Sequence, residues 1–183
     1  MQNAGYHTCA FSDTPFHPSS GFGRGFDEFY WVDGGKCHPP MNANRKVSID
    51  GVYLPPDLGP GDRKFFIQTL MNREELLETT GVYFPERLTN EGIKWLEKNA
   101  SDGKPFLLWM DYFYPHEPWD PPQYYVDKYD PGYKGIPMVM PNYGRADVFT
   151  PAELKNMAAR YKAEVQMVCA RVMSFKNEFG FYP

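Results

Sequence analysis

The chain has few of the residues that cross-link a fold or carry it through a membrane. Its 183 residues include only three cysteines, Cys9, Cys37 and Cys169. An odd number at such wide spacing excludes a disulfide framework and a Cys-x-x-Cys metal site. No apolar run approaches the roughly 18 residues of a spanning helix, so we expect no membrane span. Residues 1–5 lack the basic and apolar regions of a secretory signal and do not indicate a compartment.

Positive charge is also scarce. The 19 Lys and Arg residues are outnumbered by 23 Asp and Glu residues, for a formal net charge of −4. A nucleic-acid-binding protein usually gathers a basic excess on one face, so we expect no nucleic-acid partner. Charged residues make up 23% and hydrophobic residues 42% of the chain, which is typical of a globular domain rather than a disordered one.

Proline, glycine and aromatic residues are abundant instead. The chain has 18 Pro, 16 Gly, 14 Phe, 13 Tyr and four Trp. The Pro and Gly residues follow no fixed period, which excludes collagen-like and repeat architectures. They gather in residues 12–62 and 114–149, and we expect ordered, aromatic-rich loops there. Such loops commonly carry function on a rigid scaffold.

The remaining segments predict an α/β fold. We expect strands at residues 6–11 and 106–110, and helices at 63–79, 85–99 and from 150 to about 180. The run 106–110 is continuously apolar, as in a parallel strand buried on both faces. Two strands and three helices cannot cover both faces of such a sheet. We therefore expect this chain to be part of a larger α/β domain.

The last helix has the clearest start signal. Thr150, Pro151 and Glu153 form a capping box with proline at the first helical position. Apolar residues recur at helical spacing through residues 154–172 and predict one buried face. We expect Cys169 on that face as a small core residue.

Two segments stand where α/β proteins bind ligands, beyond the carboxyl ends of the strands. The first contains Asp13 and His17, and the second contains Asp111 and His116. A histidine there can donate a hydrogen bond to an anionic substrate oxygen or act as a general acid. Each histidine could equally be structural, His116 beneath Trp119 for example. For Asp111 we favour an anchor of the loop over a metal ligand.

Several strings of the sequence carry a family resemblance. They occur in a sensible order from residue 4 to about 173, and although each is weak alone, their combination is specific. The strings are Ala4–Thr8, Arg24–Phe29, Lys104–Trp109, Pro115–Trp119, Asn142–Asp147, Thr150–Leu154 and Tyr161–Val165. Through them the chain resembles the sulfatase family of the alkaline phosphatase superfamily.

The resemblance implies a fold, a reaction and cofactors. The family fold is α/β, a large mixed sheet sandwiched by helices, of which this chain would be a fragment. Members hydrolyse sulfate monoesters, here of a small molecule or a glycan. A formylglycine made within a Cys/Ser-x-Pro-x-Arg motif attacks sulfur, and a divalent metal, usually calcium, activates it. A metal and cationic groups would neutralise the developing oxyanion.

The resemblance also assigns residues. His116 matches the family histidine that contacts the substrate sulfate. The loop after the first strand matches a Gly-Lys-Trp-His segment, with Asp13 at the Lys position and Pro15 at the His position. His17 would replace that histidine with a two-residue shift. The expected catalytic residues are therefore His116 and His17, and the expected substrate-binding residues are these two and Asp13.

Other family features are missing. The string Cys37-His38-Pro39-Pro40-Met41 has Met where the nucleophile motif needs Arg, so we interpret Cys37 as a loop cysteine. Neither metal-ligand pair of the family occurs, and Cys169 stands where the family usually has Asp. We expect no metal ligand in this chain, no formylglycine nucleophile, and a single partial catalytic domain over residues 1–183 that is inactive alone.

Three alternatives remain open from the sequence. The first is a phosphate or phosphonate ester hydrolase of the same superfamily, favoured by Asp13 at the Lys position. The second is a non-catalytic remnant that binds sulfated glycans through aromatic loops and His116. The third is a gene product that does not fold.

Overall fold

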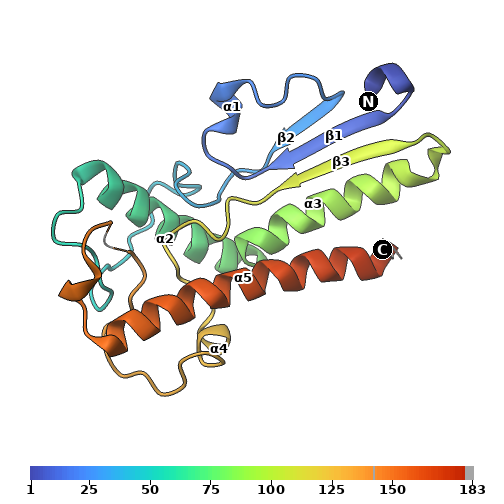
Figure 1. Cartoon of the computed structure of the whole chain (residues 1–183). Helices are drawn as coiled ribbons and strands as arrows, with labels where there is room; N and C mark the ends of the chain where they lie inside the picture. Colours follow the sequence, from blue (N-terminus) through green and yellow to red (C-terminus); the bar gives the residue numbers. More distant parts are fainter. Residues whose placement is uncertain (142, 180–183) are drawn as a thin grey trace.

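Three parallel strands form the sheet. The computed structural model describes residues 1–141 and 143–179. The central strand is β1 (His7–Ser12), with β2 (Glu28–Trp31) on one side and β3 (Phe106–Asp111) on the other (Figure 1). Ser12, the last residue of β1, pairs with the last residues of both neighbours, Trp31 and Asp111. The carboxyl ends of all three strands therefore lie at one edge.

Strand β2 corrects the sequence-based prediction, which had only loop over residues 12–62. β2 is four residues long, and none of its residues is fully buried. So short a segment has no periodicity that could reveal it. It becomes a strand because residues 28–31 pair with residues 9–12 of β1.

The helices follow the predicted pattern and confirm the α/β fold. The long helices are α2 (Pro60–Thr80), α3 (Phe84–Asn99) and α5 (Pro151–Phe179). Single turns form α1 (His17–Ser20) and α4 (Gln123–Val126). Turns of 3-10 helix cover Gln2–Ala4, Ala100–Asp102 and Ala146–Val148.

The ends of the helices have local causes. At the start of α5 the backbone N–H of Thr150 donates to Glu153 Oε2 (2.8 Å), and the Glu153 N–H donates to Thr150 Oγ1 (3.3 Å). This reciprocal pair is the predicted capping box. Helix α2 ends at Gly81, whose φ of 72° is readily adopted only by glycine.

One hydrophobic cluster of the core lies between the sheet and α3, and another packs against α5. Leu88, Trp95 and Leu96 of α3 pack against Cys9 and Phe11 of β1. Helix α5 lies beyond α3, so the layers are sheet, α3 and α5 (Figure 1). Strand β1, near the N-terminus, and helix α5, near the C-terminus, therefore both pack against α3 from the middle of the chain.

Strand β3 differs from its prediction because only alternate residues face α3. Phe106, Leu108 and Met110 pack on the α3 side, whereas Trp109 points the other way and is 50% exposed. The strand is therefore not buried on both faces.

The expectation for Cys169 is wrong. Its side chain is exposed, and so are Leu154 and Tyr161 of the face that the sequence predicted to be buried. That predicted face is therefore wrong as well, because Ala159, Ala163 and Met167 form the buried stripe of α5. Cys169 follows Met167 by two residues, which is about 200° of helical rotation and places it on the opposite side.

The helices of the described residues lack the features of a membrane span. None combines the length and the apolar character that such a span requires.

The α3 packing predicts a strong effect of core truncation. Leu96→Ala removes a fully buried side chain, and we expect it to lower the free energy of unfolding by about 2–5 kcal/mol. Urea denaturation followed by circular dichroism measures this change. The matched control is Leu154→Ala, because Leu154 is 37% exposed on α5. Equal losses from the two variants would contradict the described core.

Candidate functional site

A network of short hydrogen bonds ties together the carboxyl edge of the sheet. Asp111 Oδ2, at the end of β3, accepts from Ser12 Oγ (2.8 Å) and Thr14 Oγ1 (2.6 Å). The loop after β1 is thereby fixed to the end of β3. This confirms the interpretation of Asp111 as a loop anchor.

His17 lies on this network. Its Nδ1 is 2.8 Å from Ser12 Oγ and 3.2 Å from Asp111 Oδ2. Its ring stacks on Phe22 at a centroid distance of 3.9 Å. Within the described residues Nε2 has no hydrogen bond, so one ring nitrogen is available to a ligand. The catalytic role of His17 stays a prediction.

Asp13 is buried beneath the same edge. Its Oδ1 accepts the Phe113 N–H (2.6 Å), and its Oδ2 has no hydrogen-bond partner among the described residues. Burial raises the pKa of Asp13 to about 7, the Asp111 carboxylate adds to the rise, and the Phe113 N–H and Lys36 oppose it. Asp13 thus joins the loop after β1 to the loop after β3. Its substrate-binding role stays a prediction.

His38 lies in a proline-rich loop, where the sequence indicates no role for it, yet its side chain is fully buried beside Asp13. Its Nε2 donates to the Asp13 carbonyl (2.7 Å), and its Nδ1 accepts the Gly35 N–H (3.2 Å). Both contacts suit the neutral ring, and burial lowers the pKa of His38. No sequence pattern indicated this burial, because it depends on the Asp13 carbonyl, a backbone group of another loop.

His116 occupies a more open position. Its side chain is 46% exposed, and its ring stacks on Phe113 at 4.2 Å. Its Nδ1 lies 3.0 Å from the Glu117 carbonyl oxygen and 3.3 Å from Glu117 Oε2. The Trp119 ring packs on Tyr161 instead, so the alternative that buries His116 beneath Trp119 is wrong.

A buried ion pair holds the loop that carries His116. Lys36 Nζ donates to the His116 carbonyl (2.6 Å) and to Glu164 Oε2 of α5 (2.6 Å). The same Nζ lies 3.7 Å from the centre of the Tyr114 ring. Glu164 Oε1 accepts the Asp120 N–H (3.0 Å), so the pair grips the loop at two points.

Burial shifts the pKa values of both members of this ion pair. Burial raises the pKa of Glu164 to about 7, against the opposing effect of Lys36. Burial likewise lowers the pKa of Lys36. Sequence reasoning missed the pair, although Glu164 lies within one of the family-like strings, because a lysine in a glycine-rich loop has no distinguishing pattern.

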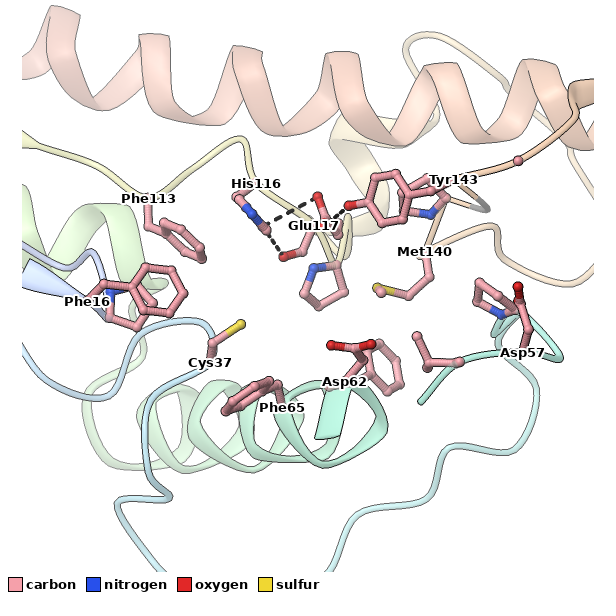
Figure 2. Close-up of a pocket in the computed structure, with 17 residues that line it drawn as sticks. Phe16, Cys37, Asp57, Asp62, Phe65, Phe113, His116, Glu117, Met140 and Tyr143 are labelled. Carbon is pink, nitrogen blue, oxygen red and sulfur yellow. Dashed lines mark hydrogen bonds and ion pairs between the residues drawn. The ribbon is translucent and has the colours of Figure 1, made fainter. Parts of the chain in front are cut away.

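His116 opens into a cavity of about 400 Å³ (Figure 2). Glu117 and Phe113 line the same wall, and Phe65 and Asp62 of α2 line the facing one. Of the predicted site residues, only His116 lines this cavity. His17 and Asp13 lie at the carboxyl edge outside it.

Comparison with known proteins identifies the family to which the chain belongs. The model of the family described as Sulfatase matches residues 1–156, most of the chain. The chain belongs to the sulfatase family.

Two relatives illustrate the extent of similarity to this sulfatase-family chain. It is 26% identical over 136 residues to "Uncharacterized sulfatase YidJ" of Escherichia coli strain K12, covering 70% of this chain and 24% of that protein. The chain thus spans about a quarter of that relative's length. A solved structure, Ps i-CgsB in complex with k-i-k-neocarrahexaose, is 22% identical with a TM-score of 0.33, covering 96% of this chain and 35% of that one.

Sulfatases generally use a divalent metal, which His, Cys, Asp and Glu side chains would have to bind. Among residues 1–141 and 143–179 no group of three or more His, Cys, Asp or Glu side chains could hold a metal ion. The donor set present does not fit calcium. Cys37 has φ of 62°, and burial raises the pKa of its thiol, which suits a loop cysteine better than a nucleophile.

The buried carboxyl of this sulfatase-family chain predicts a pH effect. The pKa of Asp13 is about 7 when folded and 3.8 as the ordinary value, so the folded state binds more protons between these pH values. Stability should therefore fall as pH rises through this window, by at most about 1.4 kcal/mol per unit from Asp13. Asp13→Asn can keep the bond from Phe113 and should flatten this fall.

Urea denaturation at pH 5 to 8 measures the effect. The control is Asp127→Asn, an exposed carboxylate on the chain surface. Parallel stability curves for the wild type and Asp13→Asn would show that Asp13 is not the titrating group.

The Lys36–Glu164 pair predicts a second effect. Glu164→Gln leaves a buried ammonium without its counter-charge, and about 3–5 kcal/mol of stability should be lost. Adding Lys36→Met should recover part of that loss, because the uncompensated charge is removed. Thermal and urea unfolding measure both variants, with the exposed Glu97→Gln as control. A loss no larger than that of the control would contradict the ion pair.

Proposed function

We propose that residues 1–183 are a single partial catalytic domain of a sulfatase that hydrolyses sulfate monoesters. Family membership supports a sulfatase-type function. The observation that carries the proposal is the place of His116. It stands at the family position for a sulfate-contacting histidine and opens into a cavity beyond the end of β3.

In this proposal His116 binds the ester through its second ring nitrogen. The Glu117 carbonyl occupies Nδ1 as an acceptor, which leaves Nε2 to face a sulfate oxygen or the bridging oxygen. The Glu117 carboxylate, 3.3 Å from Nδ1, would stabilise positive charge on the ring. His116 can therefore hold the sulfate or protonate the leaving group.

His17 and Asp13 support the same substrate. His17 is the second proposed catalytic residue, with Nδ1 held by Ser12 and Asp111 and Nε2 available. Asp13 contributes through the Phe113 N–H that it holds, because that contact places the loop that leads to His116.

The metal and the formylglycine of the family are assigned no residue of this chain. The described side chains do not fit a metal, so no step is derived through one. We expect the chain alone to be inactive.

A phosphate or phosphonate ester hydrolase is the second candidate. Asp13 stands where the family has a sulfate-binding lysine, and that absence of a cation weakens selection for sulfate. The two candidates differ in substrate alone, so one experiment separates them.

Release of 4-nitrophenol from its sulfate, phosphate and phenylphosphonate esters tests the proposal. The chain alone should give none. The full product of the gene that encodes it should cleave the sulfate, and His116→Ala should lower its kcat/KM at least about 100-fold through the lost hydrogen bond and proton. His7→Gln is the matched control, since His7 lies at the other end of β1.

Each other result has a clear meaning. Turnover by the chain alone that His116→Ala abolishes would refute inactivity. Preferred cleavage of a phosphorus ester by the full product would favour the second candidate. No cleavage of any of the three esters would reject the catalytic proposal.

A further inference from the structure

The cavity beside His116 has an aromatic lining that solvent reaches. Phe16, Phe65 and Phe113 come from three separate parts of the chain and all line it. Phe16 is 62% and Phe65 is 43% exposed. A ring that covered them would bury apolar surface from both sides, which favours binding by about 25 cal/mol per Å².

The same cavity is acidic. Asp57, Asp62 and Glu117 line it, and no Lys or Arg stands among its described lining residues. Glu117 accepts a hydrogen bond from the Tyr143 hydroxyl and faces His116. The side-chain carboxylates of Asp57 and Asp62, in contrast, have no hydrogen bond or ion pair with any other described residue.

His116 and Asp57 lie at opposite ends of the cavity. In Figure 2, His116 and Phe113 lie toward one end, and Asp57 lies at the other, beyond Asp62 and Met140. A ligand held by His116 that extends along the cavity would therefore pass Asp62 and reach toward Asp57. Three carboxylates in a partly apolar space attract a cation and repel a second anion.

We propose that this cavity holds the leaving-group alcohol of the ester and selects an aromatic alcohol that carries an amine cation. The inference rests on the proposed function, because it places the sulfate at His116. The aromatic ring would pack among Phe16, Phe65 and Phe113, and the ammonium would lie at Asp57 and Asp62. The cavity volume of about 400 Å³ suits one ring with a short side chain.

This assignment narrows the substrate class. A polysulfated glycan would bring further anions against the three carboxylates and would offer few apolar faces to the phenylalanines. The cavity therefore favours a small monosulfated amine over a sulfated glycan.

Three phenols of similar size test the inference by titration calorimetry with the chain as it exists. They are tyramine, with a cation, 4-ethylphenol, which is neutral, and 3-(4-hydroxyphenyl)propanoate, with an anion. Tyramine should bind at least about fivefold more tightly than 4-ethylphenol, because only its ammonium is attracted by the carboxylates, and the propanoate should bind most weakly because they repel its charge.

Variants identify the groups responsible. Asp57→Asn with Asp62→Asn should bring the three affinities within about twofold of one another, and Asp127→Asn should leave their order unchanged. Phe65→Ala should weaken all three by a similar factor, because it removes shared apolar contact. Equal affinities in the wild type, an order that survives the double variant, or no binding of any probe would overturn the inference.

The test is independent of sulfate hydrolysis. None of the three probes contains sulfate, so a failed hydrolysis test would leave the measured order of affinities intact. Hydrolysis that depends on His116 without any charge preference among the phenols would reject this inference and leave the proposed function standing.

Discussion

The buried ammonium of Lys36 is the constraint on which the rest of the site depends. A charge removed from water is costly unless it is paired and hydrogen-bonded. Its partners are Glu164 of α5, the carbonyl of His116 and the ring of Tyr114. Loop, helix and histidine must meet around this one group. The open position of His116 follows from that requirement, since its backbone is held while its ring stays at the surface.

The carboxylates of the site differ by their partners. Asp111 Oδ2 accepts from two hydroxyl groups and Asp13 Oδ1 accepts from a backbone N–H, and these bonds hold the carboxyl edge of the sheet. Asp57 and Asp62 have no such partners and line the cavity. Residue type alone does not separate these roles. The separation comes from which donors the fold brings within reach, and it leaves negative charge where a ligand can use it.

Membership of the sulfatase family and the geometry answer different questions. The family match covers residues 1–156 and indicates the type of reaction. The proposal for the cavity concerns instead the part of a substrate that is not sulfate, because phenylalanines and carboxylates line the space beside His116. The side chains of the described residues do not form a cluster that fits a metal ion.

The sequence by itself determined the long helices, β3, the capping box of α5 and the placement of His17 and Asp111 at a strand end. These features depend on neighbours within a few residues, where periodicity and turn signals act. Only the tertiary structure decided the existence of β2, the burial of His38, the exposure of Cys169 and the pairing of Lys36 with Glu164, 128 positions apart. Such contacts form when packing excludes water from groups that are distant in the chain, and no local pattern records them.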